Sequence, residues 1–273
     1  MKLRPIIAVA ACGAIGFFLL SAFVERMIFY PARYPEGLWE LADDLGSEDV
    51  AIETEDGIRL HGWRVASSVE PPAVTTLLLH GNAGNLTHRI DHLQAIPAAG
   101  SELLIIDYRG YGKSEGAPSE QGSYADARAA YDWLAERGRA ADRIVCHGES
   151  LGTAVAVDLA THRPCAGLVL EAPFPSARAV ASQVLPGLGP LLVSGFDTVS
   201  KLRGIRVPLL VIHGALDETF PFEFGRRVYE AAAGPKELWK LEGAGHNDIL
   251  RAAGADYVPR LERFYRQVTA AAR

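Results

Sequence analysis

Short runs of apolar, partly β-branched residues recur along the chain from about residue 51 onward. Continuous apolar runs of this length are typical of parallel strands that are buried on both faces of a sheet. Helical stretches such as Ser123–Arg137 and Leu151–Thr161 lie between them. Repeated strand–helix units predict one open, mostly parallel α/β sheet with helices on both faces. The runs are Val74–Leu79, Glu102–Ile106, Arg143–Cys146, Gly167–Leu170, Pro208–Ile212 and Leu238–Leu241.

A hairpin is predicted ahead of this series. Ala51–Thr54 and Ile58–Val65 flank Glu55-Asp56-Gly57, and Asp-Gly between apolar runs favours a tight turn. No internal repeat or linker interrupts the units that follow. We therefore predict a single domain over residues 25–273.

Composition excludes several classes of protein. The chain is 49% hydrophobic with a net charge of -6, so it is neither disordered nor a candidate for nucleic-acid binding. Cys12, Cys146 and Cys165 lie in apolar runs without Cys-x-x-Cys spacing. They fit neither a disulfide framework nor a zinc site, and we expect no bound metal.

The N-terminal segment Ile6–Val24 contains 19 consecutive residues without a charge. A helix of that length reaches roughly 28 Å, close to the thickness of a bilayer's hydrocarbon core. Lys2 and Arg4 precede the segment, and the positive-inside rule places the N-terminus in the cytoplasm. We predict a cytoplasmic N-terminus (1–5), an uncleaved transmembrane signal anchor (6–24) and a domain on the non-cytoplasmic side. The alternatives are a signal peptide cleaved after Ala22 and a buried core helix.

The pattern Gly-x-Ser-x-Gly, a signature of nucleophilic serines, occurs at Gly148–Gly152 and at Gly112–Gly116. A nucleophile elbow requires a strand directly before the serine and a helix directly after it. Ser114 in the second copy follows a glycine-broken segment and precedes Pro118, so we interpret it as structural. Ser150 in the first copy follows an apolar strand and precedes a helical run, so we predict that it is the nucleophile.

A nucleophilic serine needs a base, and the base needs an orienting acid. His246 lies in a glycine-containing loop after the last predicted strand, on the sheet edge where Ser150 emerges. His162 lies at the far end of the helix after Ser150, and His213 ends a strand and is expected to support the next turn. We therefore predict His246 as the base.

Asp217 is the predicted acid. It follows the strand Pro208–Ile212 and gives the chain order Ser, Asp, His at the carboxyl ends of strands. Glu171, at the end of the preceding strand, is the alternative acid. Asp248 is too close to His246 in the chain to orient it easily.

Attack on a carbonyl builds negative charge on oxygen, which needs preorganised donors. We expect the backbone N–H of Leu151 and a donor from the loop His80–Asn85, of which Asn82 is the best placed. A phosphate-binding loop is the other interpretation of these glycines. Neither Gly-x-Gly-x-x-Gly nor a Walker lysine is present, and we expect no cofactor.

Taken together, these motifs resemble the α/β-hydrolase superfamily. More narrowly, they resemble membrane-tethered hydrolases grouped with eukaryotic α/β-hydrolase-domain depalmitoylases and the bud-emergence-related family. The resemblance implies Ser150, Asp217 and His246 as a catalytic triad, with Asn82 and Leu151 forming the oxyanion hole. The matching segments are Phe29–Pro31, His80–Asn85, Asp107–Ser114, Gly148–Gly152, Glu171–Phe174, His213–Asp217 and Gly245-His246.

Two details qualify the resemblance. Arg109, in the family's Asp-Tyr-Arg-Gly-Tyr segment, is expected to be structural. Thr219-Phe220-Pro221 departs from the pattern, because a smaller aliphatic residue usually precedes the proline; we expect this to affect packing more than chemistry. Superfamily members that act on halides or epoxides use an aspartate nucleophile, so Ser150 argues against both activities.

We therefore expect a serine hydrolase that cleaves carboxylic esters or thioesters through an acyl-enzyme. The alternatives are a peptidase or amidase of the same fold and a non-catalytic, membrane-anchored binding protein. Residues 174–206 are predicted to form a small flap, because Ala179–Phe196 carries no charge and is broken by Pro and Gly. An apolar flap beside the pocket predicts a lipid or small-molecule acyl substrate, with Leu191 and Leu192 contributing to acyl-chain preference. The alternative is that this segment packs on the edge of the sheet and has no role in substrate binding.

Overall fold

A computed structural model describes residues 28–271. Within this range, eight strands form one sheet in the order β10-β9-β8-β7-β4-β6-β3-β2. The six strands from β10 to β6 in this order pair in parallel with their neighbours. By contrast, β3 pairs antiparallel with both β2 and β6. The predicted mostly parallel sheet is thereby confirmed. The strands are β2 (Glu48–Glu53), β3 (Arg59–Val65), β4 (Val74–Leu79), β6 (Ser101–Ile106), β7 (Ile144–Glu149), β8 (Gly167–Glu171), β9 (Leu209–Gly214) and β10 (Lys236–Leu241).

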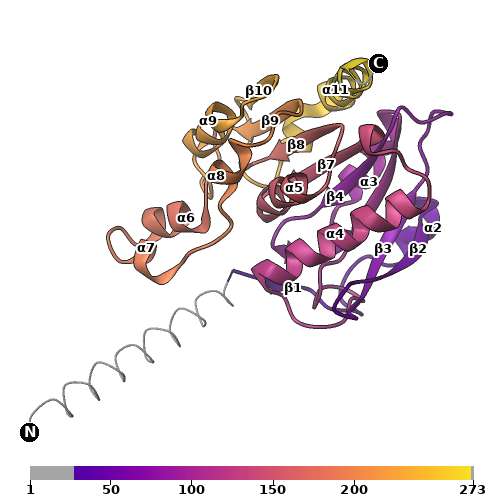
Figure 1. Cartoon of the computed structure of the whole chain (residues 1–273), viewed down its shortest axis with the longest axis horizontal. Coiled ribbons are helices and arrows are strands. Elements are labelled where there is room, and N and C mark those ends of the chain that lie inside the picture. The colour runs from indigo at the N-terminus through magenta and orange to yellow at the C-terminus, as the bar shows by residue number, and fades with distance from the viewer. Residues whose placement is uncertain (1–27, 272–273) are drawn as a thin grey trace, which may run out of the picture.

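Helices cover both faces of the sheet (Figure 1). One face packs against α4 (Glu120–Glu136), α5 (Leu151–His162), α8 (Thr198–Leu202) and α9 (Phe222–Ala231). The other face packs against α3 (Ile90–Ala98), α10 (Ile249–Ala253) and α11 (Tyr257–Ala271). The described range also contains α2 (Leu41–Asp44), α6 (Ala177–Val184), α7 (Gly189–Leu192) and a short pair of strands, β1 (Tyr30–Pro31) and β5 (Ala83–Gly84).

The apolar character of the central strands follows from this three-layer arrangement. Every residue of β4 is buried. Leu77 and Leu79 join the hydrophobic core on the α4–α5 side, whereas Leu78 joins the core on the α3–α11 side. Successive side chains of a strand point to opposite faces, so a strand between two helical layers must be apolar at every position.

The predicted hairpin is also present. The backbone N–H of Thr54 donates to the carbonyl of Ile58, and Gly57 between them has a φ of +77°. That left-handed conformation favours glycine, which explains the Asp-Gly signal. The turn joins β2 to β3 at the antiparallel edge of the sheet.

The chain between β8 and β9 forms α6, α7 and α8 rather than one long helix. Pro186 and Gly187 lie in the break between α6 and α7, as the sequence predicts. The α6–α7 pair stands away from the rest of the molecule, on the side where β1 begins (Figure 1).

Within residues 28–271, no helix has both the length and the apolar composition needed to cross a membrane. The predicted cytoplasmic segment 1–5 and the predicted signal anchor 6–24 lie outside the described residues.

Candidate active site

A sharp turn places Ser150 at the carboxyl edge of the sheet. Ser150 is the single residue between the end of β7 and the start of α5. Its φ of 50° and ψ of -113° lie in a region that residues with a side chain rarely adopt. The backbone holds this conformation: the N–H of Ser150 donates to the carbonyl of Glu171 at 2.8 Å, and the N–H of Thr153 donates to the carbonyl of Ser150 at 3.0 Å.

The two glycines of the motif are required by close backbone approach. A Cβ at Gly148 would lie 2.3 Å from the carbonyl oxygen of Gly152. A Cβ at Gly152 would lie 1.8 Å from the carbonyl oxygen of Leu79 in β4. Neither distance is compatible with a side chain, so this tight strand-to-helix turn explains the Gly-x-Ser-x-Gly pattern.

The structure brings Ser150, His246 and Asp217 into one hydrogen-bonded series. Ser150 Oγ lies 3.0 Å from His246 Nε2, and His246 Nδ1 lies 2.8 Å from Asp217 Oδ2. An ionised carboxylate only accepts, so Nδ1 carries the proton and Nε2 of the neutral ring is left to accept from the serine hydroxyl. This is the arrangement that a base-activated serine requires.

Asp217 is held in its ionised form. Burial alone would raise the pKa of this carboxyl, but hydrogen bonds from His213, His246 and the backbone of Phe220 outweigh it and hold the pKa below its ordinary value. Asp217 Oδ1 accepts from the backbone N–H of Thr219 at 2.9 Å and from that of Phe220 at 2.7 Å. His213 supports the same turn, because its Nε2 donates to the carbonyl of Phe220 at 2.8 Å.

The alternative acid, Glu171, is engaged elsewhere. Its carboxylate oxygens lie 2.9 Å from His92 Nε2 and 2.9 Å from His147 Nε2, and it also accepts from the hydroxyl of Tyr257. Burial opposes the charge of Glu171, yet the two imidazoles hold its pKa below the ordinary value. This buried cluster packs behind the elbow, where the Glu171 backbone also receives the N–H of Ser150.

The ligand atoms of His92, His147 and Glu171 lie within 4.8 Å of one another, close enough for a metal ion. Both carboxylate oxygens are already hydrogen-bonded within the cluster. We therefore interpret these residues as a structural network.

Ser114 occupies a structural position. Its hydroxyl donates to the carbonyl of Asp107 at 2.7 Å and accepts from the backbone N–H of His61 at 2.9 Å. Arg109, from the same segment, forms ion pairs with Asp56 and Asp126. Both residues brace the loop after β6 and do not line the pocket beside Ser150.

Asn82 and Leu151, the predicted oxyanion donors, both line that pocket. Leu151 is the first residue of α5, so its N–H has no acceptor within the helix. The side-chain amide of Asn82 donates to the carbonyl of Ile28 at 2.9 Å. The side chain of Asn82 thus supports the loop, and its backbone N–H is the group available to a developing oxyanion.

An ion pair between Arg89 and Glu149, which the sequence motifs did not predict, also lies at the site. Arg89 Nε donates to Glu149 Oε2 at 2.8 Å, and the same oxygen accepts from the backbone N–H of Gly81 at 3.3 Å. Arg89 Nη1 also donates to the carbonyl of Ala83 at 3.0 Å. The pair therefore ties the loop that carries Asn82 to the elbow. The sequence offered one indication of this pair, because Glu149 directly precedes the predicted nucleophile, Ser150.

The active-site pocket has a volume of about 670 Å³. Its polar part includes Ser150, His246, Asn82, Arg89, Glu149, Thr219 and Asn247. Its remaining walls are mainly apolar, and most of them come from the first described residues, the chain between β8 and β9 that contains α6 and α7, and the loop after β9. The apolar lining comprises Ile28, Leu151, Phe174, Ala177, Val180, Ala181, Val184, Leu185, Leu192, Val193, Phe196 and Phe220.

Two details of the pocket differ from the sequence-based expectations. Phe220 packs edge-to-face on the His246 ring, with centroids 4.9 Å apart, so the departure at this position touches the predicted base directly. Leu192 lines the pocket as expected, whereas Leu191 is exposed and lies outside it. Consecutive residues of a helix point in different directions, and here Leu192 faces the cavity while Leu191 faces solvent.

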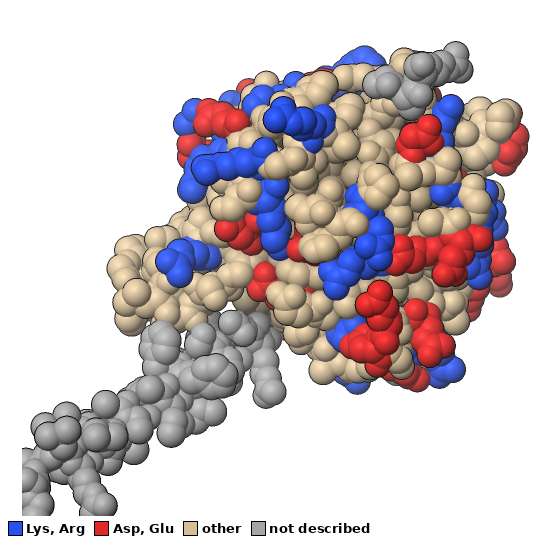
Figure 2. All heavy atoms as spheres, in the orientation of Figure 1, with Lys and Arg blue, Asp and Glu red and all other residues tan. Residues whose placement is uncertain are grey.

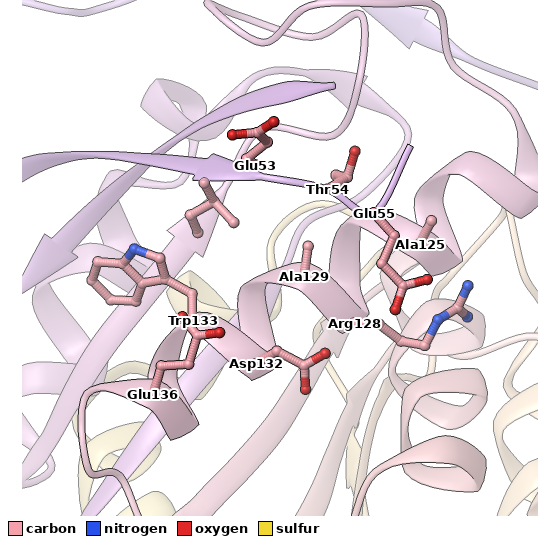
Figure 3. Close-up of a pocket in the computed structure, with 10 residues that line it drawn as sticks. Glu53, Thr54, Glu55, Ala125, Arg128, Ala129, Asp132, Trp133 and Glu136 are labelled. Atoms are coloured by element: carbon pink, nitrogen blue, oxygen red, sulfur yellow. The ribbon is translucent and has the colours of Figure 1, made fainter. Parts of the chain in front are cut away.

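A second hollow, of about 480 Å³, lies between β2 and α4. Figure 3 shows Glu53 and Glu55 on the strand side, with Arg128, Asp132 and Trp133 on the helix side. This hollow shares no residue with the active-site pocket and contains no histidine. It lacks the combination of nucleophile and base that Ser150 and His246 provide.

The chain is similar to several known proteins. A family model described as "Serine aminopeptidase, S33" matches residues 70–194. The uncharacterized protein Rv2307c of Mycobacterium tuberculosis is 37% identical over 264 residues, which cover 95% of this chain and 94% of that protein. The alpha/beta hydrolase domain-containing protein WAV2 of Arabidopsis thaliana is 33% identical over 243 residues, covering 80% and 78% of the two chains. The solved structure of the Pyrococcus furiosus esterase Pf2001 aligns with a TM-score of 0.72 and 22% identity, covering 88% of this chain and 99% of that chain, which shows the same fold.

Proposed function

We propose that this chain, which belongs to the α/β-hydrolase superfamily, is a serine hydrolase that cleaves carboxylic esters or thioesters through an acyl-enzyme. The observation that carries the proposal is the series Ser150–His246–Asp217 in hydrogen-bond contact at the wall of a largely apolar pocket. A serine hydroxyl is a weak nucleophile near neutral pH, and a base within reach activates it.

The proposed reaction proceeds in two halves. Ser150 Oγ attacks the substrate carbonyl while its proton passes to His246 Nε2, and Asp217 stabilises the resulting imidazolium. The N–H groups of Leu151 and Asn82 receive the negative charge on the carbonyl oxygen. The tetrahedral intermediate collapses, the carbon–oxygen or carbon–sulfur bond breaks, and His246 returns the proton to the leaving group. Water, deprotonated by His246, then releases the carboxylic acid from Ser150.

The pocket supports an apolar acyl group as the preferred substrate part. Val180 and Val184 of α6, Leu192 of α7 and Phe196 face the cavity that contains Ser150. Residues 174–206, the proposed flap, thereby cover the acyl side. Each buried methylene is worth about 0.8 kcal/mol, so kcat/KM should rise about fourfold per methylene until the pocket is full.

The amide-cleaving alternative is favoured by the description of the matched family model as a serine aminopeptidase. An aminopeptidase needs an acidic group for the substrate's α-ammonium. Among the described residues that line the pocket, Glu149 is the one carboxylate, and Arg89 and Gly81 already engage it. Ester or thioester cleavage, which needs no such partner, therefore stands as the leading proposal.

We further propose that residues 6–24 form an uncleaved signal anchor, with residues 1–5 in the cytoplasm and the catalytic domain of residues 25–273 on the non-cytoplasmic side. The support is the 19-residue uncharged segment and the two basic residues ahead of it. The protein would then resemble membrane-tethered depalmitoylases in acting on lipid or small-molecule acyl groups close to a bilayer.

A fluorophosphonate probe tests the proposal, because labelling requires an activated serine. We expect the wild type to be labelled and to hydrolyse p-nitrophenyl esters, and Ser150→Ala to lose both properties. Ser114→Ala is the matched control and should keep both, since that hydroxyl bonds only to backbone groups. A folded wild type that is neither labelled nor active would instead favour the non-catalytic binding protein.

A further inference from the structure

The α6–α7 lobe, residues 177–192, exposes an unusual number of aliphatic side chains. Val184 is 79% exposed, Leu185 46%, Leu188 52% and Leu191 64%. Arg178 is the single charged residue of the lobe. Figure 2 shows this lobe as a mostly uncharged projection, whereas acidic and basic side chains are frequent over the rest of the visible face. Contiguous exposed apolar surface marks an interaction site.

The lobe lies at the rim of the active-site pocket. Val184 and Leu185 line the pocket together with Ile28 and Tyr30, from the first described residues of the chain. Tyr30 is itself 58% exposed. The apolar rim and the start of the described chain therefore belong to one side of the molecule (Figure 1).

The position of the uncharged N-terminal segment identifies the partner. Ile6–Val24 ends four residues before Ile28. Four residues span at most about 14 Å even when fully extended. Any bilayer that holds this segment is thus held close to the rim formed by Ile28, Tyr30 and the α6–α7 lobe.

The composition of the lobe also fits lipid better than protein. Protein interfaces are typically anchored by Trp, Tyr or Arg at their centre, whereas the exposed side chains here are Val and Leu on two short helices and the turn between them. Aliphatic side chains of this kind insert at the boundary between headgroups and acyl chains. A tyrosine at the rim and an exposed arginine suit the headgroup region.

We propose that the α6–α7 lobe is a membrane-docking surface, with Leu188 and Leu191 inserted into the lipid and the pocket mouth facing the bilayer. Docking would let an acyl chain pass from the lipid into the pocket without crossing water. It is independent of the anchor's orientation and does not require the proposed hydrolysis.

Site-directed fluorescence on the full chain in phosphatidylcholine vesicles tests the docking. Cys146 and Cys165 are buried, so Cys12→Ser provides a background in which Leu188→Cys or Leu191→Cys can be labelled with an environment-sensitive dye. Val69→Cys is the matched control, because Val69 is 53% exposed and lies between β3 and β4, outside the lobe. We expect a blue shift at 188 and 191 and quenching there by lipids with nitroxides near the headgroup, with neither effect at 69.

Two results would overturn the proposal. The first is a dye at 188 and 191 that is as water-exposed as the dye at 69. The second is a blue shift without quenching by nitroxide lipids, which would mean that protein covers the lobe. If that shift disappeared on dilution into excess lipid, the cover would be a second copy of the chain.

An activity measurement on two substrates distinguishes the effect of docking from that of catalysis. Leu188 and Leu191 lie outside the pocket lining, so the double variant Leu188→Ser/Leu191→Ser should keep its kcat/KM on a dissolved short-chain ester. We expect a loss of at least severalfold on a long-chain ester embedded in vesicles. Equal loss on both substrates would count against docking, whereas a wild type inactive on both would refute the proposed function and leave the fluorescence result to decide the docking.

Discussion

At the scale of single residues, the site depends on a strained serine and on the partners that hold it. A non-glycine residue with a φ of 50° costs roughly 1–3 kcal/mol, and such strain persists only where the surroundings over-determine it. Here the carbonyl of Glu171 and the close-packed glycines at 148 and 152 do so. In return, the Ser150 hydroxyl is presented to His246 at the edge of the sheet.

Asp217→Asn is expected to lower kcat by roughly 10³–10⁴, because the variant loses the charge and the tautomer that a triad acid imposes on its histidine. Steady-state kinetics on a p-nitrophenyl ester measures the change. Glu171→Gln is the comparator: it breaks a buried cluster and should cost about 3–5 kcal/mol of unfolding free energy, with kcat per folded molecule largely kept. If the glutamine variant is folded but inactive while the asparagine variant works, the acid has been misassigned.

The ion pair between Arg89 and Glu149 predicts an acid-dependent loss of stability. Burial alone would raise the pKa of Glu149, but Arg89 and other partners lower it from 4.5 to about 2. A group whose pKa is lower in the folded state adds stability above its unfolded pKa, and this stability disappears as the pH falls through the folded pKa. The difference in unfolding free energy between the wild type and Glu149→Gln should therefore be full above pH 4.5 and shrink toward pH 2.

Urea denaturation of both proteins over this pH range measures that difference. Glu223→Gln is a suitable control, since Glu223 pairs with Arg226 on the exposed surface, where ion pairs contribute little. A difference that stayed constant from neutral pH down to pH 2 would mean that the charge of Glu149 is not what stabilises the fold.

At the scale of elements, the α6–α7 segment shapes the pocket. Pro186 and Gly187 lie between two short helices, α6 and α7. Both helices contribute residues to the lining of the pocket. Backbone breaks of this kind need no distant partner, which is why the sequence predicts them well. The directions of individual side chains on α7 depend on the packing of the whole segment.

Leu192→Asp should flatten the dependence of kcat/KM on acyl-chain length, because a carboxylate in the apolar wall removes the benefit of burying each added methylene. Acetate hydrolysis should change little. Leu191→Asp is the matched control, one residue away and outside the pocket, and should keep the wild-type preference for medium chains on dissolved esters. The acyl-pocket proposal would lose its support if the wild type preferred acetate. It would also lose it if kcat/KM of the Leu191→Asp control depended on chain length as weakly as that of Leu192→Asp.

At the scale of the whole molecule, the sheet brings its functional loops to one edge. Ser150 follows β7, Asp217 follows β9, and His246 follows β10. These strands pair in parallel through β8, so their carboxyl ends point the same way, as open α/β sheets require of a shared site. The first described residues reach the same pocket through Ile28.

The proposed anchor predicts that the full-length protein sediments with membranes and resists carbonate extraction. A shorter chain that begins at Glu25 should be soluble and active, because the proposed catalytic residues all lie in the domain that follows. Protease added outside intact cells should reach the domain. Protection of the domain from that protease would reverse the topology, and a cleaved N-terminus found by mass spectrometry would replace the anchor with a signal peptide.

Features that depend on near neighbours in the chain can be predicted from the amino-acid sequence. The buried strands are recognisable because both helical layers demand apolar side chains, and Ser150 is distinguishable from Ser114 because only one copy of the motif has a strand before it and a helix after it. Gly148 has a local cause as well, because a Cβ there would meet the backbone of Gly152, whereas Gly152 is required by its close approach to Leu79 in β4.

Features that depend on distant segments become visible in the folded chain. Glu171 ends β8 and Asp217 follows β9 at the same sheet edge, and the imidazoles of His92 and His147 engage Glu171, whereas Asp217 lies beside His246. Arg89 reaches Glu149 from 60 residues away, a contact that no local pattern encodes. Such choices depend on which side chains the assembled layers bring within hydrogen-bond distance, and that is settled by packing.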